Sequence, residues 1–285
     1  MKLSVVIPVY NEEKYIRECL LSIMKGIRTP DELIVVDGGS TDRTVAIARE
    51  LGAKVLSNPY RNAAAGRNIG IKAATGRVVA FTDGDCHVDS NWLHAIEEIF
   101  RGKKVDVVGG RILPAEALND IEEYWLNLQL NIIMQFGDSP LIITERNLRN
   151  SFITANCAYR RSFLHKMHGF SRWFANNGED VDLQWRSMEK GARLYYTPDA
   201  IVYYHGVTNM SELRRKSFRN GISSSKLQKK YGGKINYDPM IYRAWADALK
   251  GTLLGQKWGR YNLAETTWHL LGKYYGSIKV HVINV

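Results

Sequence analysis

Short apolar runs rich in β-branched residues alternate with amphipathic segments through the first half of this 285-residue chain. Five of these runs have the length and composition of buried strands, and the four segments between them carry helical patterns. Such an alternation predicts βαβ units and therefore a mainly parallel sheet with helices on both faces. The predicted strands are 3–9, 32–36, 54–57, 78–82 and 105–109, and the predicted helices are 14–24, 41–50, 62–73 and 91–100.

The pattern after residue 110 is less regular. Residues 125–134 mix apolar and amide side chains, and they could form a helix or a lid. Residues 151–160 resume a strand pattern, and a helix is expected to start near Glu179. Two short strands are expected at 193–196 and 201–205. From Met210 onward, a basic segment over 214–230 precedes two helical apolar faces that contain Trp and Tyr.

The net charge of +10 lies in the last quarter of the chain. Residues 1–210 contain 25 Lys and Arg and 25 Asp and Glu, whereas residues 211–285 contain 14 and 4. Such an asymmetry indicates a basic surface that meets an anionic partner. Basic residues with Trp and Tyr on amphipathic helices suit a bilayer interface. Docking of the same faces on the rest of the chain is the alternative.

Several features bear on the compartment. The three cysteines are an odd number without a CxxC pair, which predicts free thiols in a reducing environment. The apolar part of the N-terminus is too short for a signal peptide, and no apolar stretch approaches the ~18 residues of a membrane span. We therefore expect a cytoplasmic protein.

Two carboxylates one residue apart follow the fourth predicted strand, in Asp83-Gly84-Asp85. Carboxylate oxygens suit a hard cation such as Mg²⁺ or Mn²⁺, and an ion held by one or two of them keeps positions free for substrate phosphates. Asp and Gly are also ordinary turn residues, so the triplet alone is compatible with a simple turn. The metal-site interpretation of the triplet is supported by the polar residues that follow the other strands. Ligands of such sheets bind beyond the carboxyl ends of the strands.

The first two strands end in polar turns. The first continues into Pro8-Val9-Tyr10-Asn11-Glu12, and the second into Asp37-Gly38-Gly39. An acid at the position of Asp37 commonly accepts hydrogen bonds from a nucleoside. Residues 40–42 could cap the next helix, which is compatible with that role.

Two basic residues could complete a site. Arg67 lies among small residues on a predicted helix, and its guanidinium suits a phosphate. A solvated helix residue is the alternative. His205 closes a strand, and its imidazole could bind manganese or be structural.

Taken together, these segments resemble the motifs of family 2 glycosyltransferases of the GT-A fold. The resemblance covers about residues 1–209 and rests on residues 4–12, 34–42, 65–68, 83–85 and 178–180, in that order. It implies inverting transfer of a sugar from a nucleotide sugar, and a role for each motif. The implied nucleotide-sugar-binding residues are Pro8, Val9, Tyr10, Asn11, Glu12, Asp37, Arg67, Asp83 and Gly84, and the implied metal ligands are Asp83, Asp85 and His205.

The resemblance also implies a catalytic acid pair in Gly178-Glu179-Asp180. Inverting transfer needs one general base to deprotonate the acceptor, and a metal can stabilise the leaving diphosphate. A carboxylate at a helix start after the glycine-containing loop 176–178 is well placed to be that base. The bland interpretation is that acids favour a helix N-terminus through the dipole. Carried over from the family, Asp180 is the base and Glu179 helps to hold the acceptor.

The resulting hypothesis is a metal-dependent glycosyltransferase at the inner face of the cell membrane. Residues 1–209 would form a GT-A catalytic domain, with a nucleotide-sugar half (1–110) and an acceptor half (111–209). Residues 210–285 would form a basic, aromatic-rich helical region. The expected cofactor is Mn²⁺ or Mg²⁺, the expected donor is a UDP-sugar, and the expected acceptor is lipid-linked or a glycan. The sequence leaves the sugar, the acceptor and the oligomeric state open.

Two other functions are alternatives to this hypothesis. A nucleotidyltransferase that makes nucleotide sugars usually carries a glycine-rich, basic loop after the first strand, and residues 8–12 lack both features. A nucleic-acid-binding protein would suit the pI of about 9.4. No zinc, RNP or homeodomain-like pattern is present, and no nucleic-acid partner is expected.

Overall fold

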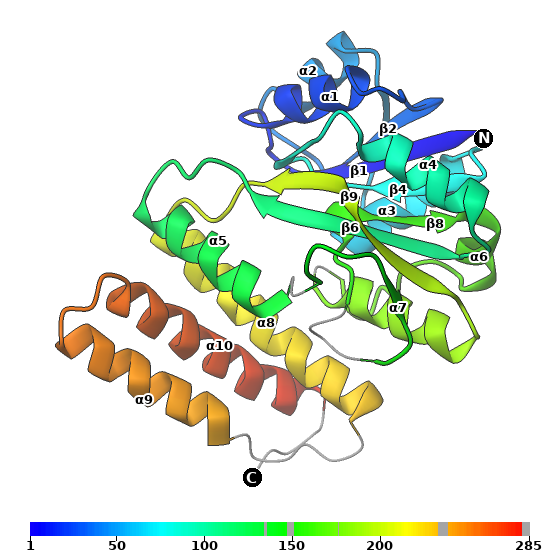
Figure 1. Cartoon of the computed structure of the whole chain (residues 1–285). Helices are drawn as coiled ribbons and strands as arrows, with labels where there is room; N and C mark the ends of the chain where they lie inside the picture. The colour runs from blue at the N-terminus through cyan, green and yellow to red at the C-terminus, as the bar shows by residue number, and fades with distance from the viewer. Residues whose placement is uncertain (134–135, 147–150, 176, 233–238, 281–285) are drawn as a thin grey trace. The chain divides into compact units, whose positions relative to one another are not determined.

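The computed structural model describes residues 1–285 except 134–135, 147–150, 176, 233–238 and 281–285 (Figure 1). Internal contacts divide the chain into two units. The first comprises Met1–Ala115, Gln129–Ala175 and Glu179–His205, and the second comprises Glu116–Leu128, Asn176–Gly178 and Gly206–Val285. The predicted domain boundary at 209–210 stays a prediction.

The first unit is built on one mixed sheet with the strand order β3-β2-β1-β4-β8-β6-β9-β5, and β7 pairs with β9. The ladders β3-β2-β1-β4 and β6-β9 are parallel. β8 is antiparallel to β4 and β6, and both β5 and β7 are antiparallel to β9. The strands are β1 (Leu3–Val9), β2 (Glu32–Asp37), β3 (Lys54–Ser57), β4 (Val78–Phe81), β5 (Cys86–Val88), β6 (Val107–Pro114), β7 (Leu141–Ile143), β8 (Cys157–Arg160) and β9 (Leu194–Tyr204).

Helices cover both faces of this sheet. Alternate residues of a strand point to opposite faces, so Val5 and Ile7 of β1 join one apolar cluster and Val6 joins the other. The first cluster includes apolar residues of α1 and α4, and the second includes residues of α3, α6 and α7. The predicted α/β fold with helices on both faces is therefore confirmed. The helices are α1 (Ile16–Met24), α2 (Thr44–Glu50), α3 (Ala63–Ala73), α4 (Trp92–Gly102), α6 (Arg161–Lys166) and α7 (Glu179–Glu189).

Two predictions about elements were wrong, and three short elements were not predicted. Residues 151–156 do not form a strand, because side-chain hydrogen bonds replace strand pairing there. Gln184 Oε1 accepts a hydrogen bond from Phe152 N, and the buried Asn156 amide donates to two backbone carbonyls. The strands expected at 193–196 and 201–205 are one strand, β9. The short elements β5, β7 and α6 were not predicted. Residues 125–133 belong to the helix α5 (Asp120–Ile133), and Met134 lies outside the described residues.

The second unit contains α8 (Met210–Tyr231), α9 (Pro239–Leu253), α10 (Gly259–Lys279) and the first part of α5. Glycines let α8 and α10 approach closely. A Cβ on Gly221 would lie 2.1 Å from His269 O, and one on Gly272 would lie 2.0 Å from Phe218 O. Among the described residues, no helix combines the length and apolar character that a bilayer crossing requires.

Candidate active site

The loops that follow β1 and β2 are tied to each other by hydrogen bonds. Asn11 N donates to Ser40 Oγ (2.8 Å), and Thr41 N donates to Asn11 Oδ1 (2.9 Å). Glu12 N donates to Thr44 Oγ1 (2.7 Å). Because β1 and β2 are parallel, their carboxyl ends lie at one edge of the sheet, and these bonds join the two loops there. The structure thus brings residues 8–12 and Asp37 together.

Asp37 is held by the turn that follows it. Its carboxylate accepts hydrogen bonds from Gly39 N (3.1 Å) and Ser40 N (3.0 Å). Gly39 has a φ of +90°, a backbone conformation that glycine adopts without strain. A carboxylate has about four acceptor positions, so these bonds fix the group and leave it able to accept from a ligand.

The triplet Asp83-Gly84-Asp85 connects β4 to β5 at the same edge. A Cβ on Gly84 would lie 3.0 Å from Glu12 Cγ and 3.1 Å from Val9 Cγ1, so glycine lets the triplet pack on the loop after β1. The backbone oxygen of Asp85 accepts a hydrogen bond from His205 N (3.0 Å). The end of β9 is thereby attached to the triplet.

Arg67 of α3 joins the triplet to the acid pair. Its Nη2 lies 2.7 Å from Asp83 Oδ1, and its Nη1 lies 2.6 Å from Glu179 Oε1. Arg67 is only 3% exposed, so the interpretation of this residue as a solvated helix residue was wrong. Burial lowers the pKa of Arg67, but the charges of Asp83 and Glu179 outweigh it and raise the pKa overall. The guanidinium is a permanent cation between two carboxylates.

Glu179 and Asp180 begin α7, after Gly178 with a φ of +80°. Burial raises the pKa of both carboxyls, and the charge of Arg67 opposes that rise. The Val181 N–H, 2.8 Å from Asp180 Oδ1, also opposes it at Asp180. Glu179 Oε2 is buried and has no hydrogen-bond partner in the described part of the chain. Asn176, named with the loop before this pair, lies outside the described residues.

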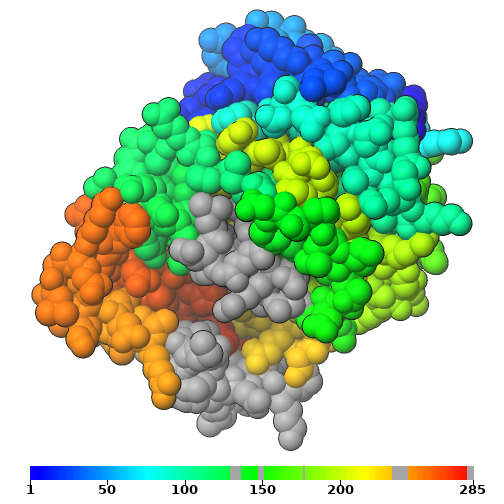
Figure 2. All heavy atoms as spheres, viewed as in Figure 1, coloured from blue at the N-terminus to red at the C-terminus, as the bar shows by residue number. Residues whose placement is uncertain are grey.

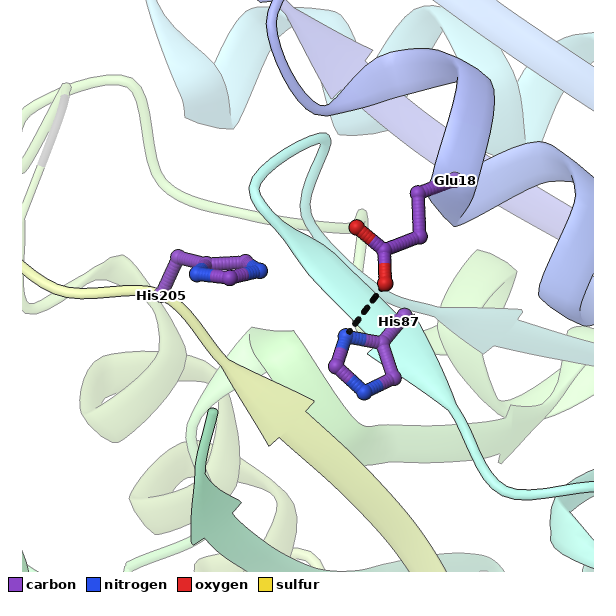
Figure 3. A group of neighbouring side chains, drawn as sticks. All are labelled: Glu18, His87 and His205. Carbon is purple, nitrogen blue, oxygen red and sulfur yellow. Dashed lines mark ion pairs between the residues drawn. The ribbon is translucent and has the colours of Figure 1, made fainter. Parts of the chain in front are cut away.

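His205 is buried at 9% exposure, and its ring stacks on Tyr15 with the centroids 4.4 Å apart. Two further residues lie beside it that the sequence analysis missed. His87 Nδ1 is 3.5 Å from Glu18 Oε1, and ligand atoms of Glu18, His87 and His205 all lie within 4.8 Å of one another (Figure 3). One signal could have found His87: it stands two residues after Asp85 and next to the triplet in the sequence.

Comparison with known proteins identifies the family of this chain. The model of the family "Glycosyl transferase family 2" matches residues 4–167. Glycosyltransferase AglE of Haloferax volcanii is 30% identical over 226 residues, covering 76% of this chain and 71% of that protein. The pre-mycofactocin glycosyltransferase of Mycobacterium tuberculosis is 31% identical over 224 residues. The match covers 76% of this chain but only 46% of that relative, so the chain spans about half of its length.

Solved structures show the same fold. Glucosyl-3-phosphoglycerate synthase from M. tuberculosis, in complex with Mn²⁺, UDP-glucose and phosphoglyceric acid, has a TM-score of 0.58 at 20% identity, over 81% of this chain and 80% of that one. The mannosyltransferase PcManGT from Pyrobaculum calidifontis, in complex with GDP-mannose and Mn²⁺, has a TM-score of 0.60 at 18% identity, over 98% and 75%.

The chain therefore belongs to glycosyltransferase family 2 and has the α/β fold of GT-A enzymes. It is a glycosyltransferase.

Proposed function

We propose that this enzyme transfers a sugar from a nucleoside-diphosphate sugar to an acceptor hydroxyl or phosphate, with inversion at the anomeric carbon. The observation that carries the proposal is the position of Arg67 between Asp83 and Glu179. Asp83 belongs to the triplet that would face the donor diphosphate, and Glu179 belongs to the acid pair that would face the acceptor. The buried guanidinium of Arg67 thus connects the proposed donor side to the proposed acceptor side. A single-displacement transfer needs these two sides next to each other.

The donor nucleoside would bind at the joined loops after β1 and β2. Pro8 to Glu12 would line it, and the fixed Asp37 carboxylate would accept a hydrogen bond from the base or the ribose. A uridine donor suits Asp37, and UDP-glucose is bound by one of the related folds. Another related fold binds GDP-mannose, so GDP-sugars have to be compared with UDP-sugars as donors.

A divalent cation, Mn²⁺ or Mg²⁺, would be held by Asp85 and His205, with Asp83 beside them. The backbone bond between Asp85 and His205 supports this grouping, since it ties the two residues together. When bound, such an ion offsets the negative charge that grows on the departing diphosphate. One carboxylate oxygen of Asp83 is paired with Arg67, and the Asp83 side chain is 28% exposed. Asp83 would therefore face the ion with the part of its carboxylate that Arg67 does not contact.

Asp180 would be the general base. Its carboxylate would accept the proton of the acceptor hydroxyl as the acceptor oxygen forms its bond to the anomeric carbon. The bond from that carbon to the diphosphate oxygen breaks in the same step, and the electron pair leaves with the nucleoside diphosphate. A pKa raised by burial makes Asp180 a stronger base than an ordinary aspartate, which favours this role. Glu179, held by Arg67, would orient the acceptor.

Thermal denaturation with a panel of donors tests the proposal. UDP-, GDP- and dTDP-sugars are added to the protein with and without Mn²⁺ or Mg²⁺. At about 100 times its Kd, the correct donor should raise Tm by about 5–10 °C. The rise should depend on the metal and shrink in Asp85→Asn. If no donor stabilises the protein with either metal, the proposal fails; stabilisation by GDP-sugars alone would reject only the UDP assignment.

We further propose that the second unit binds an anionic membrane surface and that the acceptor is lipid-linked. Residues 243–247 of α9 are exposed, and this helix lies at the surface in Figure 2. Of the large apolar side chains in α10, four are well exposed, at 44–75%. Other residues of the apolar faces, Ala248 and Tyr261, are buried. The exposed part is basic and aromatic, which suits a bilayer interface. The four exposed apolar side chains of α10 are Leu271, Tyr274, Tyr275 and Ile278.

Sedimentation with vesicles tests the membrane proposal. The full-length protein should sediment with vesicles that contain anionic lipid and less with neutral ones. Each basic residue near such a surface contributes about 1 kcal/mol, so Arg214→Glu/Arg215→Glu should weaken binding at least tenfold. The matched control, Lys72→Glu/Lys104→Glu, makes the same charge change at exposed lysines of the first unit. Equal weakening by both pairs would show that net charge alone is responsible and would reject the second unit as the binding surface.

A further inference from the structure

Three side chains with metal-binding atoms converge from three elements of the first unit. Glu18 comes from α1, His87 from β5 and His205 from the residue after β9, and Figure 3 shows them facing a common space. Glu18 Oε1 and His87 Nδ1 lie 3.5 Å apart. The cluster is open on one side, because the Glu18 side chain is 58% exposed, whereas the His87 side chain is 26% exposed.

Aromatic neighbours fix both imidazoles. The His87 ring stacks on Tyr203 with the centroids 4.9 Å apart and an interplanar angle of 16°. Tyr203 stands opposite His87 in the ladder between β5 and β9, so the sheet itself sets this stack. The His205 ring stacks on Tyr15 at 4.4 Å and 22°. Both rings are therefore oriented before any ion arrives, which lowers the entropy cost of binding.

The spacing of the ligand atoms fits a transition-metal ion. With bonds of about 2.0–2.1 Å, the ligands of a tetrahedral ion lie roughly 3.3 Å apart. The Glu18–His87 pair, at 3.5 Å, is already near this value. No separation within the cluster exceeds 4.8 Å, so side-chain shifts of at most roughly 1.5 Å would complete the set. The Glu18 side chain is 58% exposed, so this ligand can adjust without moving the core.

We propose that Glu18, His87 and His205 form a binding site for a divalent transition-metal ion of the zinc and cobalt class. Two imidazoles and one carboxylate favour such an ion over Mg²⁺, which prefers oxygen ligands and octahedral geometry. The carboxylate supplies the negative charge, and the two neutral imidazoles supply nitrogen donors. Three protein ligands leave at least one coordination position open to water or a ligand.

This site differs from the cation site proposed for the donor diphosphate. Glu18 and His87 do not belong to the triplet, and His205 is the one residue named in both. An ion on Glu18 and His87 would use the same His205 imidazole that the proposed donor cation would need. The two sites should therefore compete for His205, although binding at the new site does not depend on the proposed function.

Titration with Co²⁺ alone, in the absence of nucleotide, tests the site. The visible absorption of bound cobalt reports on nitrogen ligation and low coordination number without any turnover. The full-length protein should bind one Co²⁺ with such a spectrum. Glu18→Gln and His87→Gln should each weaken this binding roughly tenfold or more, because each removes one ligand. Asp85→Asn, which removes only a ligand of the other site, should leave the spectrum in place.

Matched controls are Glu98→Gln and His94→Gln, which make the same changes at exposed positions of α4. Circular dichroism of each metal-free variant checks that it is folded. The proposal fails if no cobalt spectrum appears, or if Asp85→Asn abolishes it while Glu18→Gln and His87→Gln do not. It also fails if the control variants weaken binding as much as the site variants. Each of these results leaves the donor panel to decide the proposed function separately.

Discussion

Replacement of Asp180 by asparagine should lower the rate of sugar transfer by about 10²–10⁴-fold, the range expected for loss of a general base. Asparagine keeps the shape of the side chain and can still accept the Val181 N–H, so the start of α7 should be preserved. It cannot take the proton of the acceptor. The measurement is the single-turnover rate with saturating donor and acceptor, together with donor affinity from the thermal shift, which should not change.

The control for this variant is Glu189→Gln, which removes an exposed carboxylate from the far end of the same helix and should keep full activity. Burial raises the pKa of Asp180, so this carboxyl becomes protonated at a higher pH than an ordinary aspartate does. The rate of the wild-type enzyme should therefore begin to fall at that higher pH as the solution is acidified. A rate within about threefold of wild type for Asp180→Asn would eliminate Asp180 as the base. An equal loss of donor binding would instead indicate a structural role.

Replacement of Arg67 by methionine should lower the free energy of unfolding by about 3–5 kcal/mol, as expected when one partner of a buried ion pair is removed. Methionine fills most of the same volume but leaves Glu179, which is 5% exposed, without a countercharge. Asp83, at 28%, keeps partial access to water, so most of the loss should arise at Glu179. Urea denaturation measures the change.

The pH dependence of the free energy of unfolding shows why Arg67→Met is less stable than the wild type. Burial already raises the pKa of Glu179, and loss of Arg67 removes the main charge that lowers it, so the pKa rises further. A carboxyl whose folded pKa exceeds its unfolded value contributes most below the unfolded pKa and loses that contribution as the pH rises through the folded pKa. The deficit of Arg67→Met should therefore be larger near pH 8 than near pH 5.

Adding Glu179→Gln to Arg67→Met supplies the matched control, because it removes the carboxylate left alone. The double variant should recover part of the loss and should show a flatter pH profile. A deficit that is independent of pH and is not relieved by Glu179→Gln would mean that packing of α3, rather than uncompensated charge, accounts for the effect.

Much of the fold could be predicted because its signals are local. Residues 3–9 and 54–57 were predicted with the observed strand bounds, since a buried parallel strand is a short β-branched run with polar turns at its ends. The positions of the triplet and of Asp37 at one edge followed from the same reasoning. β5 and β7 were missed because three residues are too few to show a period.

The remainder of the site depends on contacts that no local pattern encodes. Arg67 and Glu179 are separated by 112 residues, and Glu18 and His87 come from a helix and a strand with no shared motif. Nothing in the residues around Arg67 distinguishes a buried arginine from a solvated one. Its partners become evident only when α3 and α7 are placed on the sheet.

The separation of 112 residues between Arg67 and Glu179 has a consequence for the protein during its synthesis. At about 5–20 residues per second, a ribosome needs roughly 6–22 s to reach Glu179 after it has added Arg67. During that interval β1 to β4 and α3 have all left the peptidyl transferase centre, and Asp83 is the only one of the two acidic partners already made. The pair between Arg67 and Asp83 can therefore form first, and the pair between Arg67 and Glu179 can form only after α7 has been made.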